Sequence, residues 1–455
     1  MAESAYGEWT SGAVGAGGAG RDLGAPARAP RDGAPRRQAA RESAARTYAR
    51  ALPIVPVRAR GLTIEGADGR RYLDCVSGGG TLALGHNHPV VLEAIRKVLE
   101  SGAPLQVMNL TTPVEDAFVT ELLHTLPPGL ADRARVRFCG PPGTDAVAAA
   151  VGLVRAATGR SRVTAFTDAP LGPPADEPLT RGDRDGAPFD RLPYPRDARG
   201  AEAALDALSS RQSPPAGLVV EPVRGGGTVF PAPDAWMRRL RRITAERSVP
   251  LIVDETDTGV GRTGAFWAVE HSGITPDVLV LSRAIGGSLP LAAVVHRDDL
   301  PGGGPGTGAF RGNQLALAAG TATLAHVREH RLAEHAAAVG ARVLARLREL
   351  GEEFACVGEV RGRGLLIGVE MLAPEGAGAA APETAAAVQR ECLRRGLIVD
   401  RGGPSANVVR LLPPLTITKE QATAVLDRLA DAVRAVAAAA PRTDRAASRE
   451  PRGPH

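Results

Sequence analysis

The residues best suited to chemistry follow two short apolar segments in the middle of the chain. Leu251–Val253 is followed by Asp254-Glu255-Thr256-Asp257, and Val278–Leu281 is followed by Ser282-Arg283. Carboxylates hold cations or protons, whereas a guanidinium stays protonated at any usable pH and is neither an amine nucleophile nor a base. From these residue types we expect Arg283 to act as a fixed cation, which could pair with Asp254 or Asp257 or could hold a phosphate or carboxylate ligand.

A second candidate site lies where Gly143 and Thr144 open a predicted helix. Backbone N–H groups at the start of a helix favour a phosphate or another anion. Glycine before a helix also occurs in many loops that bind nothing, so this signal is weak by itself.

Short apolar segments alternate with segments of helical spacing, which predicts an α/β fold. The expected strands are Val136–Cys139, Leu218–Glu221, Leu251–Val253, Val278–Leu281 and Leu291–Val295, and the expected helices are Pro89–Glu100, Asp145–Ala157 and one capped by Asp234. This alternation favours a mostly parallel sheet covered on both faces. Beyond about residue 325, helices mix with short strands at Leu365–Val369 and Val408–Leu411, which predicts a second, smaller α+β domain.

Composition indicates a soluble globular protein rather than a nucleic-acid-binding or membrane protein. The chain has 455 residues, of which 44% are hydrophobic and only 3% aromatic, and its formal charge of +5 comes from scattered basic residues. Stacking platforms for single strands are therefore not expected, and no apolar run approaches a membrane span. Lysine occurs at two positions only, Lys97 and Lys419.

The cysteines and the N-terminus favour a cytoplasmic location. The four cysteines, Cys75, Cys139, Cys356 and Cys392, lie far apart without metal-ligand spacing, so we expect reduced thiols in the core and no metal site. The N-terminus is rich in arginine but lacks the apolar core of a secretory signal.

Longer segments resemble the class III aminotransferases. The resemblance extends from Ala51 to about Ala438 and rests on SGGGTLALGHNHPVV, FCGPPGTDAV, VVEPVRGGGTVFPAP, the VDE and SRAIGG segments, FRGNQLALAAGTATL, VRGRGLLIGVEM and VVRLLPPLTIT. Within the family these segments look most like those of diaminobutyrate–2-oxoglutarate transaminases. The resemblance implies pyridoxal 5'-phosphate (PLP) as cofactor, and amino acid and 2-oxo acid substrates.

The resemblance also implies fold type I, with a large cofactor domain, a small α+β domain built from both chain ends, and a homodimer with active sites at its interface. On this basis we expect a disordered tail at 1–45, the N-terminal part of the small domain at 46–108, the large domain at 109–325, the rest of the small domain at 326–440 and a disordered tail at 441–455.

Several site roles are implied by the matching motifs. Asp254 matches the aspartate that pairs with the cofactor's pyridine nitrogen, which keeps the ring able to accept electrons, although an aspartate at a strand end also caps turns. Gly143 and Thr144 match the phosphate site, and Glu221 is retained in the EPV segment. Arg410 matches the arginine that holds a substrate carboxylate; without the family it is a surface arginine beside a strand.

The departures from the family pattern gather at this same site. Arg283 occupies the position of the Schiff-base lysine, and Asp257 that of a glutamine that donates to the cofactor's phenolate oxygen. Pro170 stands where the family has a stacking aromatic ring, Leu171 where it has a histidine, and Thr256 where it has a face-packing valine. Gly226 replaces the glutamate companion of Arg410. Ala309 replaces a threonine that reaches the neighbour's phosphate, and Thr307 is a candidate substitute for that threonine.

Three hypotheses follow from this pattern. The favoured one is a family member that has lost transamination and pairs with itself or with an active paralogue. The second is a working PLP enzyme with an unusual base, for which Asp257 or His271 is a candidate. The third is a ligand-binding or interaction module whose arginine-rich N-terminal tail contacts a partner.

Overall fold

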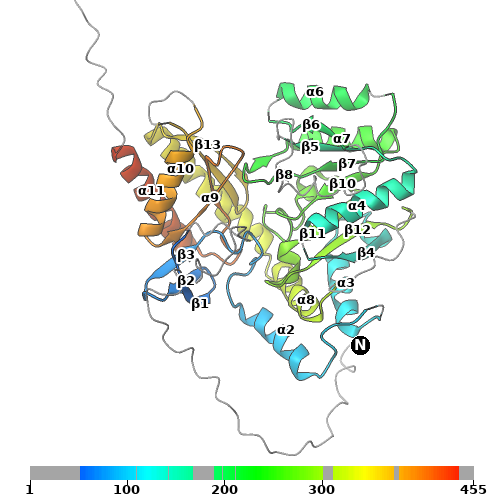
Figure 1. The fold of residues 1–455 in the computed structure, drawn as a ribbon, viewed down its shortest axis with the longest axis horizontal. Helices are drawn as coiled ribbons and strands as arrows, with labels where there is room; N and C mark the ends of the chain where they lie inside the picture. Colours follow the sequence, from blue (N-terminus) through cyan, green and yellow to red (C-terminus); the bar gives the residue numbers. More distant parts are fainter. Residues whose placement is uncertain are drawn as a thin grey trace, which may run out of the picture. The chain divides into compact units, whose positions relative to one another are not determined.

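A seven-stranded sheet carries the residues that follow the two apolar segments. Its strand order is β4-β12-β11-β10-β7-β5-β6, which can be followed by the labels in Figure 1. The strands are β4 (Ala134–Cys139), β5 (Val163–Thr167), β6 (Phe189–Pro193), β7 (Gly217–Val220), β10 (Leu251–Asp254), β11 (Val278–Ser282) and β12 (Ala292–Arg297). Neighbouring strands are parallel except that β12 runs antiparallel to both β11 and β4. The predicted α/β fold with a mostly parallel sheet is therefore confirmed.

The computed structural model describes residues 52–108, 110–141, 143–167, 189–196, 198–210, 212–300, 311–373 and 379–439. The tails that the sequence predicts to be disordered lie outside the described residues. The described residues from Pro56 onward belong to one compact unit. The domain boundaries expected from the family stay predictions.

Alternate residues of the central strands face opposite sides of the sheet. On β10, Leu251 and Val253 join one buried cluster while Ile252 joins another. Helix α4 (Gly143–Thr158) packs on the side of Ile252, and helices α3 (Pro113–Thr125), α7 (Asp234–Glu246) and α8 (Gln314–Glu329) contribute to the cluster on the other side. Both faces are thus covered, which explains why these strands are continuously apolar.

Smaller sheets join segments that are far apart in the sequence. One sheet has the order β1-β2-β3-β15, with β1 (Pro56–Arg60), β2 (Thr63–Gly66), β3 (Arg71–Asp74) and β15 (Leu397–Ile398). Another has the order β13-β14-β17-β16, with β13 (Val357–Arg363), β14 (Leu366–Met371), β17 (Val408–Leu411) and β16 (Asp400–Gly402), and β8 (Val223–Arg224) pairs with β9 (Phe230–Pro231). The N-terminal strands are therefore held by a strand from near the end of the chain.

The remaining elements are helical. They are α2 (Pro89–Glu100), α6 (Ala198–Ser209), α9 (Leu332–Glu353), α10 (Pro382–Arg394), α11 (Lys419–Ala439) and the short 3-10 helices η1 (Ala131–Arg133), η2 (Ala268–Ser272) and η3 (Arg283–Gly286). Helix α2 has the predicted bounds. The predicted cap at Asp234 is wrong by one residue: Pro233 precedes the helix, and the Asp234 carboxylate accepts a hydrogen bond from Arg363 instead.

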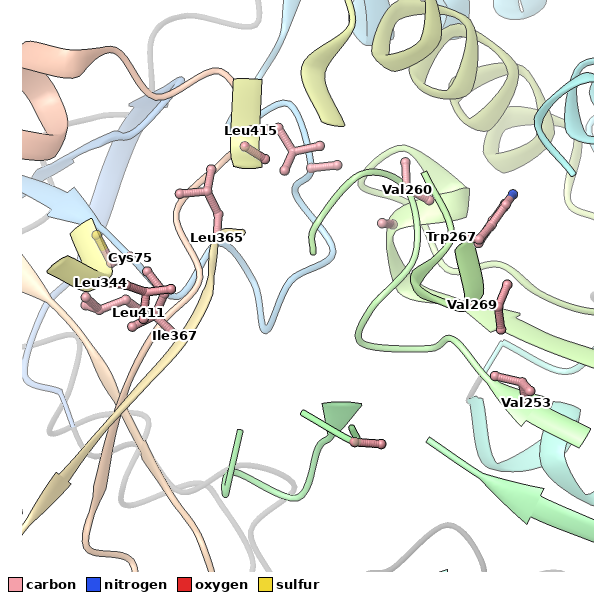
Figure 2. Packing of buried hydrophobic residues seen from close by; sticks show 14 of the residues in the cluster. Cys75, Val253, Val260, Trp267, Val269, Leu344, Leu365, Ile367, Leu411 and Leu415 are labelled. Carbon is pink, nitrogen blue, oxygen red and sulfur yellow. The ribbon is translucent and has the colours of Figure 1, made fainter. Parts of the chain in front are cut away.

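Buried side chains from both ends of the chain meet in one continuous cluster. Figure 2 shows Cys75, Leu344, Ile367 and Leu411 gathered together, and Val253 with Trp267 in another part of the same cluster. The Trp267 indole N–H donates to the carbonyl oxygen of Thr125, so its polar atom is satisfied although the side chain is fully buried. The four cysteines are buried free thiols, as predicted.

Within the described part of the chain, no helix combines the length and the apolar character needed to cross a membrane. The same residues contain no group of three or more His, Cys, Asp or Glu side chains that could hold a metal ion.

Truncation of Leu279 tests the role of the central sheet. Leu279 is fully buried on β11, between Val253 and Val295 on the adjacent strands. We expect Leu279→Ala to lower the free energy of unfolding by about 2–5 kcal/mol, because it leaves a cavity between two packed layers. Urea unfolding followed by circular dichroism measures this. Val57→Ala, at a residue 52% exposed on β1, is the control, and equal shifts in the two variants would contradict the expectation.

Candidate functional site

Three predicted site residues lie at the carboxyl ends of neighbouring parallel strands. Glu221 follows β7, Asp254 ends β10 and Arg283 follows β11. The strand register pairs Val253 with Val220, and Asp254 with Val280. Because parallel strands end at the same edge of a sheet, the three side chains emerge side by side. This edge is where open α/β sheets bind their ligands.

The start of helix α4 lies against the same edge. A Cβ atom added to Gly143 would come within 3.1 Å of Thr256 Cγ2 and 3.4 Å of Ser282 Cβ. The first N–H groups of the helix are therefore close to the ends of β10 and β11, as an anion site would require. The side chain of Thr144, and all of Pro170, Leu171, Thr307 and Ala309, lie outside the described part of the structure, so their predicted roles stay predictions.

Asp254 is a half-buried carboxyl at the centre of this edge. Its Oδ1 accepts a hydrogen bond of 2.9 Å from the backbone N–H of Thr256, which is the turn-capping contact expected of an aspartate at a strand end. Burial raises the pKa of Asp254 to about 6; the nearby charge of Asp257 raises it as well, while the cation of Arg283 lowers it. A cation placed beside Asp254 would favour its ionised form. Pairing with a ring nitrogen stays a prediction.

Glu221 is held by the loop that follows it. Its Oε2 accepts a hydrogen bond of 2.6 Å from the backbone N–H of Gly225, and its Oε1 forms a short ion pair with Arg224. Burial raises the pKa of Glu221 to about 7, whereas the cation of Arg224 lowers it. A Cβ atom at Gly225 would lie 2.8 Å from an oxygen of Glu221 and 2.8 Å from an oxygen of Asp257, so only glycine lets both carboxylates approach here.

Arg283 is fixed at both ends of its guanidinium. Nε lies 3.0 Å from Oδ1 of Asp257, and Nη1 donates a short hydrogen bond to the carbonyl oxygen of Gly79, in the turn before α2. The backbone of Arg283 is left-handed, with φ of 53°. Asp257 Oδ1 is buried and has no hydrogen bond of good geometry among the described residues, so the contact with Arg283 is an ion pair rather than an aligned hydrogen bond.

The buried guanidinium of Arg262 also lies within the electrostatic influence of Asp257. Arg262 is only 3% exposed and donates to the backbone carbonyl of Pro413. Burial lowers the pKa of Arg262 to about 10, and the charge of Asp257 raises it. The edge of the sheet thus gathers carboxylates and guanidinium groups that depend on one another for neutralisation.

Arg410, the predicted carboxylate-binding residue, already has a partner. It lies on β17 directly opposite Asp400 on β16, and the two side chains form a short ion pair. The Nε atom of Arg410 is buried and has no hydrogen bond among the described residues. Gly226, where the family pattern has the companion glutamate, accepts a backbone hydrogen bond from Gly403. A carboxylate from the adjacent strand therefore takes the place of the missing companion.

His271 does not join this group. Its Nε2 contacts the carbonyl and hydroxyl oxygens of Thr263, each at 3.1 Å, and burial lowers its pKa. The structure gives it a packing position within η2.

Five residues of the site were not predicted from the sequence: Gly79, Arg224, Gly225, Arg262 and Asp400. Arg224 follows Glu221 by three residues, and that spacing could have suggested their ion pair. Nothing in the sequence signals Gly79 or Asp400, because their contacts arise from segments 204 and 10 residues away in the chain.

The comparisons with known proteins agree with this geometry. A family model described as aminotransferase class-III matches residues 44–173 and 182–433. The chain belongs to the class III aminotransferase family. It is 43% identical to the diaminobutyrate–2-oxoglutarate aminotransferase of Rhizobium meliloti, over 87% of this chain and 91% of that protein, and 38% identical to the Haemophilus influenzae enzyme of the same name, over 87% and 94%.

A solved relative shows what the family binds. An amine transaminase from an uncultivated Pseudomonas species, crystallised with PLP as an internal aldimine, has a TM-score of 0.76, is 26% identical and covers 87% of this chain and 98% of its own. Covalent attachment of this kind needs a primary amine of the protein. This chain has only two lysines, Lys97 on α2 and Lys419 at the start of α11, and both are exposed. The residues present at the edge of the sheet therefore do not fit a covalently held PLP.

The raised pKa of Asp254 predicts a specific pH dependence. An acid whose pKa is higher in the folded state binds its proton more tightly when folded, so the wild type loses stability as pH rises through the window from about 4 to about 6. Asp254→Asn removes this loss and keeps the oxygen that accepts from Thr256. As pH rises through that window, the unfolding free energy of the variant minus that of the wild type should increase by up to about 3 kcal/mol.

Urea unfolding at a series of pH values measures the difference. The matched control is Asp427→Asn, at an exposed position on α11, which should show no such gain. A difference between Asp254→Asn and the wild type that is constant from pH 4 to pH 7 would contradict the assignment.

Proposed function

We propose that this member of the class III aminotransferase family does not catalyse transamination, and that it serves as a structural subunit that pairs with a second copy of itself. The observation that carries the proposal is Arg283, a guanidinium at the end of β11 that resembles the family's Schiff-base position. An arginine supplies neither the nucleophile nor the base of the reaction, because its proton does not leave at usable pH. Both roles are lost together.

The contacts of Arg283 support this proposal. Its guanidinium is already engaged by Asp257 and by the carbonyl of Gly79, so it is not available as a mobile group. The loss of general acid–base help alone costs a reaction about 10²–10⁴-fold in rate. Loss of covalent attachment adds to this, because the cofactor must then be held by noncovalent contacts alone.

The opposite end of the site supports it as well. Asp400 neutralises Arg410, the residue expected to receive a substrate carboxylate. A 2-oxo acid would have to displace this aspartate before it could bind. Arg283 and Arg410, at the two ends of the site, are therefore both paired with carboxylates of the protein itself, while the sheet and its packing helices are retained. Random decay would damage the packing as readily as the chemistry, and this bias favours a chain kept for its shape.

Direct assay of the wild-type protein tests the proposal. With PLP, 2,4-diaminobutyrate and 2-oxoglutarate, we expect no glutamate beyond the background without protein, because the site lacks an amine at Arg283. After borohydride treatment and desalting, we expect no PLP to remain on the protein. The Rhizobium meliloti relative, assayed in parallel, is the positive control. Sustained turnover, or PLP fixed by borohydride in the wild type, would sink the proposal and favour a working enzyme.

An exposed apolar strip suggests where a second copy binds. Leu105, Met108 and Leu110 in the segment after α2 are 44%, 63% and 67% exposed, and Leu92 and Leu99 on α2 itself are also exposed. These five exposed residues lie within one stretch of the chain, and large apolar side chains that form a patch on a surface usually mark an interface. We propose that a second copy of this chain covers them; an active paralogue in its place is the alternative that the same surface would allow.

Light scattering after size-exclusion chromatography tests this interface. The wild type should have the mass of a dimer. Replacement of Leu105, Met108 and Leu110 together by serine should shift the mass toward the monomer, because about 1,200–2,000 Å² of buried area is needed for a stable pair. Val57→Ser, which removes an exposed apolar side chain on β1, should leave the dimer intact. A monomeric wild type would exclude self-pairing and leave the paralogue as the partner to test.

A further inference from the structure

Asp257 and Arg283 form a pair whose members come from different strands. Asp257 lies three residues beyond the end of β10, and Arg283 directly follows β11. Their side chains meet with 3.0 Å between Oδ1 and Nε, and the Asp257 side chain is only 17% exposed. No described residue gives Asp257 Oδ1 a hydrogen bond of good geometry, so its contact with Arg283 is an ion pair. Arg283 is therefore the main neutralising contact of this oxygen.

The surroundings of the pair are rich in carboxylates. Asp254 and Glu221 both feel the negative charge of Asp257, which raises the pKa of each in addition to the larger effect of burial. Asp257 and Glu221 also converge on Gly225, where an added Cβ would lie 2.8 Å from an oxygen of each. Without the guanidinium of Arg283, these acids would repel one another in a poorly solvated place.

The other nearby cations make different contacts. Arg224 forms a short ion pair with Glu221. Arg262 is close enough for the charge of Asp257 to raise its pKa, but its short hydrogen bond goes to the backbone carbonyl of Pro413. Within the part of the chain that the structure describes, Arg283 is the guanidinium in ion-pair contact with Asp257. The charge at position 283 and the charge of Asp257 therefore depend on each other.

This dependence has a chemical consequence for an amine placed at position 283. An opposite charge within about 4–6 Å favours the protonated form of an amine. Condensation with an aldehyde needs the unprotonated form, whose nitrogen attacks the carbonyl carbon; a C–N bond forms and water leaves. Beside Asp257, an ammonium would keep its proton. The arginine is therefore not the sole obstacle to this chemistry.

We propose that Asp257 is a second block on the site, which keeps an amine introduced at position 283 from condensing with an aldehyde, so that both residues must change before PLP is held covalently. This inference rests on the proposed loss of transamination and extends it. Substitution of either Arg283 or Asp257 alone leaves the other residue as an obstacle to covalent attachment. Lysine in place of Arg283 gains a carboxylate partner that holds its proton, and removal of Asp257 alone leaves a guanidinium that cannot react.

The test compares Arg283→Lys, Asp257→Asn and the double variant in the full-length chain. Each is incubated with PLP at pH 7.5, reduced with borohydride, desalted and weighed by mass spectrometry, and the labelled position is identified by peptide mapping. We expect the double variant to gain one phosphopyridoxyl group at position 283. Arg283→Lys should be labelled at least about tenfold more slowly, and its rate should rise with pH as the ammonium loses its proton.

Controls distinguish this inference from nonspecific labelling, from misfolding and from failure of the proposed function. Labelling of the wild type at Lys97 or Lys419 measures nonspecific reaction, and Asp257→Asn should not exceed it. Thermal unfolding checks that each variant folds, and Arg283→Lys with Asp257→Ser replaces the double variant if that one does not. Equal labelling of Arg283→Lys and the folded double variant at pH 7.5 overturns the inference, as does a folded double variant that takes no label. Labelled or active wild type would instead overturn the proposed function.

Discussion

The parallel pairing of β7, β10 and β11 is the constraint on which the site depends. These strands are buried on both faces, so their backbone groups must be satisfied within the sheet, and their register follows from that requirement. The register places Glu221, Asp254 and Arg283 at one edge. The ion pairing at this edge follows from that convergence.

Charge neutralisation decides what this edge can do. Carboxylates that are withdrawn from water need cations nearby, and the protein supplies them itself: Arg224 for Glu221 and Arg283 for Asp257. The cation of Arg410 is likewise neutralised by the carboxylate of Asp400. In an aminotransferase these places would be completed by cofactor and substrate. A site whose charges are neutralised by its own residues does not need these ligands for stability, and this is the physical basis for the structural role that we propose.

Backbone approach depends on glycine where the segments meet. The carboxylates of Glu221 and Asp257 approach over Gly225, which has no room for a side chain, and Gly227 lies so close to Gly402 that an added Cβ would be 2.3 Å from its Cα. These contacts bring the loop after β7 against β16, the strand that carries Asp400. The glycines therefore couple the two ends of the site, although none of them takes part in chemistry.

The sequence by itself determined the fold and its family, because continuous apolar strands such as Val278–Leu281 and the spacing of α2 are local signals. It also identified Asp254, Asp257 and Arg283 as the residues that matter, and named the pair between the last two as one possibility. Only the tertiary structure decided which cation serves which carboxylate. Asp400 and Gly79 reach their partners through strand register and a turn far away in the chain, and such long-range contacts leave no periodic trace in a sequence.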